Sequence, residues 1–253
     1  MNIKTPDSAD IPALRSLWRE SFDDSKEFLD CFFSTAFSTN RCRCILSNDA
    51  LVAALHWFDC MYMDKPVAYL YAIATAKAYQ GQGLCHALMQ DTHLHLSKLG
   101  YKGAILVPEN AKLFELYQGI GYQTCCQHSE FACSASGEKI VLRHIDIDEY
   151  ACLRRKLLPA NSVIQEHENL YFLANQASLY AGETFLLAAN IENQQLFGIE
   201  LLGDSTAAPH ILHTLNCSYG TFRTPGGGIP FAMYHDLSEG SLPLPSYFGL
   251  GFD

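Results

Sequence analysis

The feature that most constrains this sequence is a glycine turn within residues 78–89, which separates an apolar run from a helical pattern. The run Val67–Thr75 is rich in Tyr, Ile and Ala, as a buried strand is. After the glycines, apolar residues recur at helical spacing, at Leu84, Leu88, Leu96 and Leu99. A strand, a glycine turn and a helix in this order present backbone N–H groups at a helix N-terminus. A pyrophosphate is the natural occupant of such a turn.

Composition limits the classes of protein to which this chain can belong. With 253 residues, 49% of them hydrophobic and 17% charged, it predicts one large or two modest folded domains. The net charge of −10 and the lack of a Lys/Arg run argue against binding to nucleic acid or to an anionic membrane. The sequence contains no apolar run of about 18 residues, so no membrane span is predicted. Residues 1–7 lack the apolar core of a signal peptide. The ten cysteines are therefore expected as thiols in the cytoplasm.

The first half of the chain alternates helical and strand patterns. Helices are predicted over Asp7–Glu20, Lys26–Phe37, residues 84–99 and Asn110–Gly119. Strands are predicted over Cys42–Leu46, Leu51–Met61, Val67–Thr75, Gly103–Val107 and Tyr122–Cys133. Short turns join the first three strands, so we expect an α/β (α+β) domain whose mixed, mostly antiparallel central sheet is flanked by helices.

A small polar stretch at Ser134–Lys139 predicts a boundary between domains 1–134 and 135–253. The second domain, a smaller α/β unit, begins with predicted helices and then a hairpin: Ile147–Leu158, Val163–Gln176, Thr184–Ile191 and Gln195–Leu202. Helix, helix, hairpin is also the order of residues 7–61, a weak indication of an internal repeat. Beyond it we expect a helix over Pro209–Leu215 and strands over Phe231–His235 and Tyr247–Phe252.

Two motifs carry a family resemblance. Gln80-Gly81-Gln82-Gly83-Leu84-Cys85 resembles motif A of the GNAT acetyltransferases, which has Gln or Arg, two residues, Gly, one residue, and Gly or Ala. Cys85 departs from that pattern at the last position. A strand-ending turn in an unrelated α/β protein is the alternative for this motif alone. The segment Asn110–Tyr122 is similar to the family's later motif through Asn110, Tyr117 and the Gly121-Tyr122 pair.

The order and spacing of the two motifs identify residues 1–130 as resembling a GNAT domain. The second half is a candidate degenerate copy of the same fold. It has no matching glycine turn, so we expect no second cofactor site there and expect this half to line the acceptor cleft. The resemblance implies acetyl-CoA as acyl donor, with no metal. Its pyrophosphate would bind the backbone around Gln80, Gly81, Gln82, Gly83, Leu84, Cys85 and His86, and its pantetheine arm would pair with the strand at Ile73, Ala74 and Thr75. Asn110 would bind the cofactor arm or cap its helix, and Tyr117 would act as general acid as well as contact the cofactor.

The implied reaction moves an acetyl group to a primary amine of a small molecule or peptide, by direct attack through a tetrahedral intermediate. The group that deprotonates the amine stays open among water, His56, Asp59, Tyr69, Tyr71, Glu109 and, as in some tandem-domain relatives, the Asp253 carboxylate. A zinc site at Cys125, Cys126, His128 and Cys133 is disfavoured because C-x₂-C spacing is absent. The main rival is a GNAT-fold module that binds CoA or a metabolite without turnover. The sequence leaves the acceptor, the acyl chain length and the oligomeric state open.

Overall fold

The structure is a computed structural model that describes residues 2–238, 240 and 242–252. It divides into two compact units, each built from two segments of the chain. Unit 1 comprises Met1–Gln123 and Met233–Pro243, and unit 2 comprises Thr124–Ala232 and Leu244–Asp253. The boundary predicted at Ser134–Lys139 cuts the chain once, whereas here the chain passes between the units three times.

Unit 1 is built on a row of strands with helices on both faces. Its strands are β1 (Asn2–Lys4), β2 (Cys42–Ser47), β3 (Ala50–Tyr62), β4 (Lys65–Thr75), β5 (Gly103–Leu106) and the end of β13 (Ile229–Asp236). They lie in this order in the sheet. Neighbours are antiparallel except β4 and β5, which are parallel. The mixed, mostly antiparallel sheet predicted for this half is therefore confirmed.

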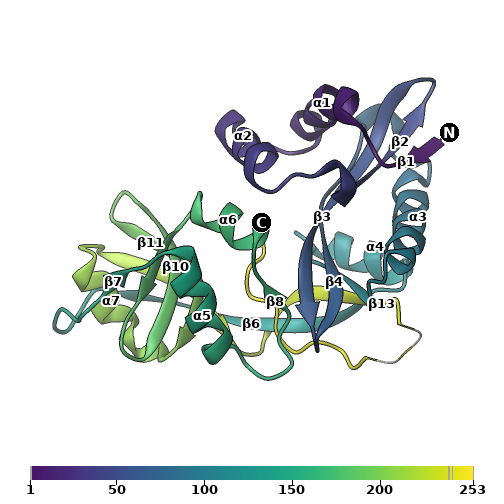
Figure 1. Cartoon of the computed structure of the whole chain (residues 1–253). Coiled ribbons are helices and arrows are strands. Elements are labelled where there is room, and N and C mark those ends of the chain that lie inside the picture. Colours follow the sequence, from purple (N-terminus) through teal and green to yellow (C-terminus); the bar gives the residue numbers. More distant parts are fainter. Residues whose placement is uncertain (1, 239, 241, 253) are drawn as a thin grey trace. The chain divides into compact units, whose positions relative to one another are not determined.

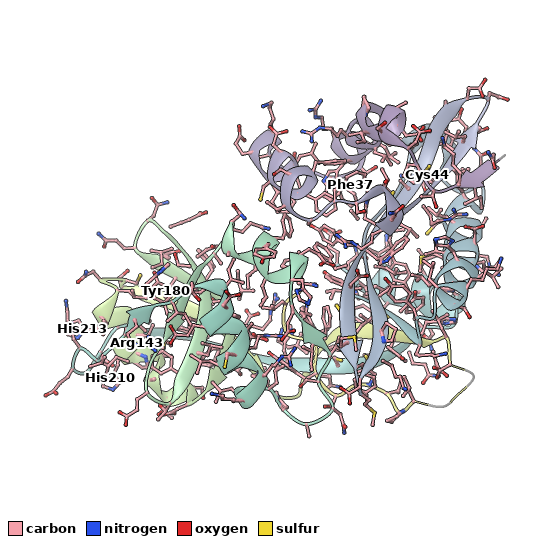
Figure 2. All side chains as sticks on the ribbon, viewed as in Figure 1. Phe37, Cys44, Arg143, Tyr180, His210 and His213 are labelled. Atoms are coloured by element: carbon pink, nitrogen blue, oxygen red, sulfur yellow. The ribbon has the colours of Figure 1, made fainter. Side chains whose placement is uncertain are left out.

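Two helices cover each face of this sheet (Figure 1). One face carries α1 (Ile11–Ser21) and α2 (Lys26–Thr35), and the other carries α3 (Leu84–Lys98) and α4 (Ala111–Gly119). Short 3₁₀ turns, η1 (Ser8–Asp10), η2 (Thr39–Arg41) and η3 (Lys77–Tyr79), lie between these elements. Leu14 and Leu17 of α1 pack against Cys44 of β2, with Phe37 at the edge of that cluster (Figure 2). The unit is thus a sandwich of helices, sheet and helices.

The boundaries of these elements follow from local side-chain chemistry. Asp7 caps the first turn: its carboxylate accepts from the Ala9 N–H at 2.8 Å, and its own N–H donates to the Asp10 carboxylate at 2.8 Å. Asn48 and Asp49 have φ of 48° and 62°, the left-handed conformation that a two-residue hairpin turn requires. The predicted β2–β3 hairpin is therefore present.

Unit 2 is likewise built on a row of strands with helices on both faces. Its strands lie in the order β6 (Gln123–Ser134), β12 (Tyr219–Pro225), β11 (Gln195–Gly203), β10 (Phe185–Glu192), β9 (Ser178–Ala181) and β7 (Arg143–His144). Its helices are α5 (Ile147–Leu157), α6 (Glu168–Ala174), η4 (Ser205–Ala207) and α7 (Ala208–Thr214), and β8 (Ile164–Gln165) is a short extended segment. Tyr150 and Leu170 pack on one face of the sheet, and Ile211 and Leu212 pack on the other.

Helix α7 also holds the loop that follows β6. His210 Nδ1 donates to the Glu138 carbonyl at 2.9 Å, and His213 Nδ1 donates to the Gly137 carbonyl at 2.8 Å (Figure 2). These bonds fix the polar stretch in which the domain boundary was expected, so the stretch is a loop anchored within unit 2.

The two units share one order of elements. Two helices and an antiparallel set of strands precede a parallel crossover, which is β4–α3–β5 in unit 1 and β11–α7–β12 in unit 2. The repeat of helix, helix and hairpin in the sequence therefore extends through the crossover. Descent of the two units from one domain remains a prediction.

Two predicted elements of the second half are wrong in part or in whole. Val163–Gln176 is not one helix, because β8 is extended and α6 begins only after His167, whose φ is 51°. Tyr247–Phe252 is not a strand: within it, only Tyr247 forms a bridge, to Ser162. The sequence patterns also missed the strands β1, β7, β9 and β12.

The C-terminal segment is held by a buried polar cluster instead of by strand pairing. Arg154 and Glu200 form an ion pair through Nε–Oε2 at 2.7 Å and Nη2–Oε1 at 2.9 Å. The hydroxyls of Tyr150 and Tyr247 each donate to Glu200 at 3.0 Å. Side chains from α5, β11 and the C-terminal segment therefore satisfy one buried carboxylate.

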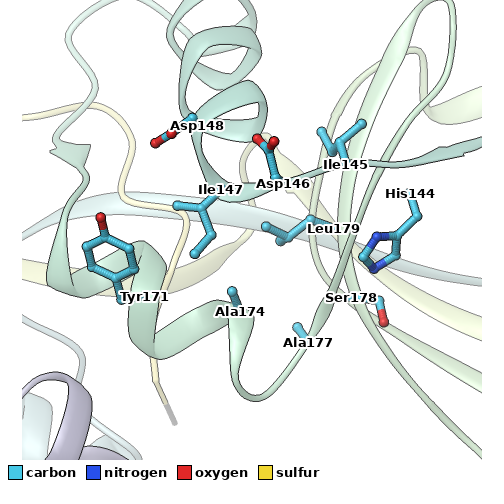
Figure 3. A pocket seen from close by; sticks show the side chains of 10 residues that line it. All are labelled: His144, Ile145, Asp146, Ile147, Asp148, Tyr171, Ala174, Ala177, Ser178 and Leu179. Atoms are coloured by element: carbon cyan, nitrogen blue, oxygen red, sulfur yellow. The ribbon is translucent and has the colours of Figure 1, made fainter.

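A hollow of about 440 Å³ lies at the start of α5 (Figure 3). Asp146 and Asp148 lie on its rim, and Tyr171 flanks it with 51% of its surface exposed. Asp146 caps α5 by accepting from the Glu149 N–H at 2.8 Å. Asp146 therefore has a structural role as the N-cap of α5, and the hollow results from the packing of α5 and α6.

Candidate active site

The parallel strands β4 and β5 separate at one end of unit 1. Their pairing runs from Val67–Gly103 to Tyr69–Ile105, but β4 continues to Thr75. The β3–β4 register also shifts in this region, where Ala72 has a φ of 49°. A bulge of this kind bends a strand away from its neighbour. The predicted pantetheine-binding residues, Ile73, Ala74 and Thr75, all lie on the part of β4 beyond its pairing with β5.

The glycine turn follows directly from this open part of β4. Gly81 and Gly83 have φ of 74° and 75°, a conformation that other residues rarely adopt. A Cβ atom at either position would meet nothing within 4 Å. The fold therefore requires these glycines for their backbone conformation, and the space in front of them is open. Close approach of a ligand, the reason expected from the sequence, stays a prediction.

Free backbone N–H groups lie at the start of α3. Gly83 is the N-cap residue and has no side chain to satisfy them. The first intrahelical bond joins the Ala87 N–H to the Gly83 carbonyl at 3.0 Å, so the N–H groups of Leu84, Cys85 and His86 precede the helical pattern. These three groups and the helix dipole favour an anion at this point.

The two glutamines of the turn support its shape. Gln80 Nε2 donates to the Thr75 carbonyl at 3.1 Å, and Gln82 Nε2 donates to the Ala78 carbonyl at 3.3 Å. The predicted residues from Gln80 to His86 thus form a turn and the first residues of α3. Their binding to pyrophosphate stays a prediction.

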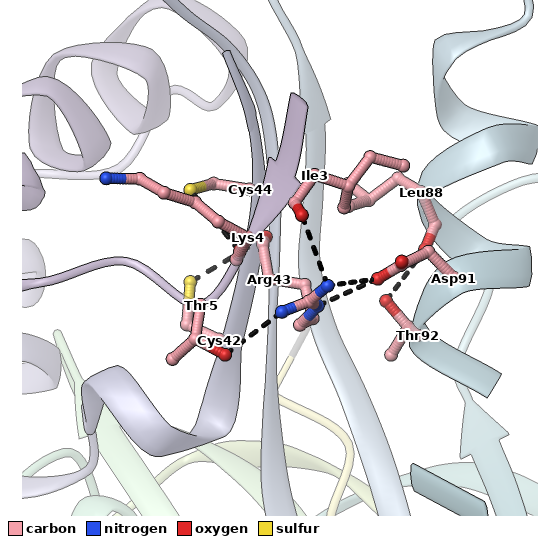
Figure 4. A network of polar contacts seen from close by, with 9 residues as sticks. All are labelled: Ile3, Lys4, Thr5, Cys42, Arg43, Cys44, Leu88, Asp91 and Thr92. Carbon is pink, nitrogen blue, oxygen red and sulfur yellow. Dashed lines mark hydrogen bonds and ion pairs between the residues drawn. The ribbon is translucent and has the colours of Figure 1, made fainter. Parts of the chain in front are cut away.

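Helix α3 is tied to the sheet by Arg43 of β2 (Figure 4). Its Nε and Nη2 donate to the Asp91 carboxylate at 2.8 and 2.6 Å, and its Nη1 donates to the Thr5 hydroxyl at 3.0 Å. The Arg43 side chain is only 11% exposed. This contact, in which both donors share the Oδ2 atom of Asp91, fixes α3, and with it the N–H groups at its start, against β1 and β2.

Tyr117 lies on α4 in the same core as the first turns of α3. It is 6% exposed and packs in one cluster with Leu88, Met89 and the partly buried Cys85. Burial raises the pKa of the Tyr117 hydroxyl, and the nearby Cys85 adds a smaller shift in the same direction. The phenol therefore keeps its proton at neutral pH and can donate it. Burial likewise raises the pKa of the Cys85 thiol, which disfavours a nucleophilic thiolate.

Asn110 caps α4. Its side-chain oxygen accepts from the Leu113 N–H at 3.2 Å, and its backbone is extended, as an N-cap residue requires. Of the two predicted roles, helix capping is thus present in the structure, and contact with the cofactor arm stays a prediction.

His56 lies in an aromatic cluster on the α1–α2 face of the sheet. Its ring centroid is 5.3 Å from Phe32, 5.5 Å from Phe37 and 5.7 Å from Trp18. Burial lowers the pKa of His56 to about 3, and its Nδ1 has no hydrogen-bond partner among the described residues. The imidazole is therefore neutral at pH 7, which permits it to accept a proton but makes it a weak base.

The other candidate bases differ in their surroundings. Asp59 lies 3.4 Å from Arg41 and accepts a hydrogen bond from the Tyr101 hydroxyl. Tyr69 is buried and Tyr71 is half-buried in the aromatic cluster, whereas Glu109 is exposed after β5. The Asp253 carboxylate lies outside the described residues. The geometry brings His56 and Tyr71 to one face of the sheet without singling out a base.

Neither a metal centre nor a membrane span is found in the part of the chain that the structure describes. There, no three His, Cys, Asp or Glu side chains lie close enough together to hold a metal ion. Cys125 and Cys126 are adjacent, with their sulfur atoms 3.3 Å apart, and the Cys126 thiol lies 3.6 Å from the Pro245 carbonyl. Within the same residues, no helix has the length and apolar character needed to cross a membrane.

Comparisons with known proteins agree with this geometry. The family model of the acetyltransferase (GNAT) domain matches residues 2–125. No curated protein matches the sequence significantly. Among solved structures, a GCN5-related N-acetyltransferase from Anabaena variabilis superposes with a TM-score of 0.75 at 13% identity, covering 93% of this chain and 72% of its own.

Two further structures are similar over the same extent. A GCN5-related N-acetyltransferase from Kribbella flavida has a TM-score of 0.71 and 13% identity, covering 94% of this chain and 71% of its own. Eis1 from Mycobacterium abscessus has a TM-score of 0.69 and 9% identity, covering 94% and 74%. At such identities these likenesses show the fold alone. Residues 2–125, which contain the glycine turn, the opened β4 strand and Tyr117, therefore belong to the GNAT acetyltransferase family.

Proposed function

We propose that this protein transfers an acetyl group from acetyl-CoA to a primary amine. The observation that carries the proposal is the convergence of three features in unit 1. The open part of β4 leads directly into the glycine turn at α3, and Tyr117 packs against the same end of α3. Together they offer an anion site, an unpaired strand edge and a protonated phenol.

Each feature has a chemical role in acyl transfer. The N–H groups of Leu84, Cys85 and His86 bind the pyrophosphate, which places the donor along the opened strand. The backbone of Ile73–Thr75 pairs with the amides of the pantetheine arm, as an added strand would. An N–H group of this segment can also stabilise negative charge on the thioester oxygen during attack.

The proton steps follow from the protonation states of this chain's groups. The neutral amine attacks the thioester carbon, and collapse of the tetrahedral intermediate releases the CoA thiolate. The buried Tyr117 hydroxyl supplies the proton that this thiolate takes up. Direct attack is favoured over a Cys85 acyl-enzyme because burial keeps that thiol protonated. The amine loses its proton to water or to one of the candidate bases.

The acceptor is a small-molecule or peptide amine. The net charge of −10 favours a cationic one, such as a polyamine, an aminoglycoside or a lysine side chain. The alternative function is a GNAT-fold module that holds CoA or a metabolite without turnover, and the atypical Cys85 in the glycine motif favours it.

Thiol release distinguishes the two functions. The protein is mixed with acetyl-CoA and a panel of primary amines, and free CoA is measured together with the acetylated product. An enzyme releases thiol in step with product for at least one amine. A binding module shows thermal stabilisation by CoA but no amine-dependent release, and that result across the panel would reject the catalytic proposal.

A further inference from the structure

Two adjacent cysteines lie near the start of β6, in unit 2. Cys125 and Cys126 have their sulfur atoms 3.3 Å apart. Successive side chains of an extended strand point to opposite faces, which carries the ends of neighbouring side chains apart. Here both side chains turn toward each other instead. The pair is therefore a preformed dithiol and not two independent thiols.

The two thiols differ in their access to solvent. Cys126 is fully buried, whereas Cys125 is half-buried. Each also lies near a backbone carbonyl: Cys125 Sγ is 3.5 Å from the Ala232 oxygen, and Cys126 Sγ is 3.6 Å from the Pro245 oxygen. A thiol is a weak hydrogen-bond donor, so little free energy is lost when a ligand replaces either proton. A reagent can therefore bind Cys125 first and then Cys126 beside it.

The separation of the sulfurs indicates the geometry of a bound atom. A bond from sulfur to a thiophilic atom such as zinc is about 2.3 Å long, so two sulfurs on one atom with a bent S–X–S angle lie about 3–4 Å apart. A linear two-coordinate ion would instead need them about 4.6 Å apart. The 3.3 Å between Cys125 Sγ and Cys126 Sγ suits the bent arrangement.

The number of protein ligands limits the class of the bound atom further. Sulfur ligands select soft atoms, and zinc in a structural site takes four protein ligands. Within the described residues, no three His, Cys, Asp or Glu side chains lie close enough together to hold a metal ion. A monosubstituted trivalent arsenic forms three bonds and brings one of them itself, to carbon. Two sulfurs therefore complete such an arsenical, whereas they leave zinc without half of its ligands.

We propose that Cys125 and Cys126 form a binding site for a monosubstituted trivalent arsenical. With an arsine oxide, R–As=O, the bond from arsenic to oxygen and both S–H bonds break, and two As–S bonds form. The oxygen and the two thiol protons leave as one water molecule. Arsenic stays trivalent throughout, so the reaction needs neither an oxidant nor a reductant. The site lies in unit 2 and stands independently of the acetyl transfer proposed for unit 1.

Phenylarsine oxide tests the site on the full chain. After a wash with excess glutathione, intact mass spectrometry should still show one phenylarsenic group on each chain, whereas dimercaptopropanol should release it. A monothiol cannot match two sulfurs held on one molecule, but a dithiol can. X-ray absorption at the arsenic edge, on the adduct freed of other thiols, should show two sulfur neighbours. Release by glutathione or a single sulfur neighbour would overturn the proposal.

Substitutions locate the arsenical. Cys125→Ser and Cys126→Ala each leave one sulfur of the pair, so affinity should fall by about 10²-fold or more, because the second As–S bond forms within one molecule. Cys152→Ser is the matched control: Cys152 is exposed on α5 and has no cysteine next to it in the sequence, so its loss should leave affinity unchanged. Circular dichroism checks that each variant is folded. Full affinity in a folded Cys125→Ser variant would place the arsenical elsewhere and overturn the site, and the count of sulfur neighbours decides the same question on the unsubstituted protein.

Discussion

At the scale of single residues, burial sets which groups can exchange a proton. Tyr117 and Cys85 share a core cluster, and burial raises the pKa of both, so each keeps its proton at neutral pH. His56 is also buried, but burial removes its proton instead. One physical cause thus gives unit 1 a phenol suited to donate and an imidazole restricted to accept.

Tyr117→Phe tests the proposed acid. The ring and its packing are retained while the proton donor is lost, so turnover should fall by about 10²–10⁴-fold, the usual contribution of general acid catalysis. Affinity for CoA, measured by titration, should stay within about twofold because the pyrophosphate contacts come from backbone groups. The adjacent Tyr122→Phe is the control for a general loss of packing in this core. Turnover of Tyr117→Phe equal to that of the unsubstituted enzyme would remove Tyr117 from the acid role.

At the scale of elements, the ends of helices and strands carry the chemistry. The start of α3 has a backbone anion site because Gly83 adopts a positive φ and offers no side-chain cap. The far end of β4 is open because the strand bends away from β5 after Tyr69. Both features lie at the end of an element, where backbone groups are left unpaired, and not in its middle, where the backbone groups bond to one another.

Gly83→Ala should separate conformation from ligand binding. Alanine at a φ of 75° is strained, so the free energy of unfolding should fall by about 1 kcal/mol, and CoA binding should weaken as the N–H groups shift. Gly100→Ala is a matched control at the other end of α3, where φ is 92° and a Cβ would also meet nothing within 4 Å. It should cost similar stability without changing CoA affinity. Equal affinities for both variants in calorimetry would contradict an anion site at the glycine turn.

The buried ion pair of unit 2 gives a second test at this scale. Arg154→Met leaves the Glu200 carboxylate buried with only its two tyrosine donors, so unfolding should become easier by about 3–5 kcal/mol in denaturant titration. The exposed pair Arg143–Glu149, at 2.7 Å, provides the comparison. Arg143→Ala should cost much less, because solvent screens an exposed ion pair. A similar loss in the free energy of unfolding for both variants would show that burial does not make the Arg154–Glu200 pair more important for stability than the exposed pair.

Local signals in the sequence predicted most of the elements that build the candidate site. The Asp7 cap, the Asn48-Asp49 turn and the glycines at 81 and 83 each act within a few residues, so their effect can be read from the sequence. The role of Tyr117 as a candidate acid came from the family resemblance, whereas its packing beside Cys85 is seen only in the structure, because α3 and α4 are separate in the chain. The pairing of β13 with β5 depends on residues far apart in sequence, and no local pattern indicates it.

At the scale of the whole molecule, buried neutral histidines make stability depend on pH. Burial lowers the pKa of both His56 and His93 to about 3, and the charge of nearby His235 adds to the shift of His93. In the unfolded chain both imidazoles have the ordinary histidine pKa of 6.5. The unfolded state therefore binds more protons between these two values, and stability is lost as the pH falls through that range.

Chemical denaturation at several pH values measures this effect. Between pH 7 and pH 5 each histidine should reduce the free energy of unfolding by about 2 kcal/mol. His56→Phe, which fits the aromatic cluster, should remove about half of the combined slope, and His93→Asn should remove the other half. A slope unchanged in both variants would mean that other groups govern the acid sensitivity.

The pairing of β13 with β5 has a consequence for how the protein is made. Residues 233–236 complete the sheet of unit 1, yet they leave the ribosome after almost all of unit 2. During synthesis, the nascent N-terminal unit therefore waits with the edge of β5 exposed, a ready template for pairing with other chains. Neither unit can reach its final form as an independent module of the nascent chain. Chaperones should accordingly stay bound to the nascent chain until β13 emerges from the ribosome. Residues 1–123 expressed without the rest of the chain should lack the strand that pairs with β5.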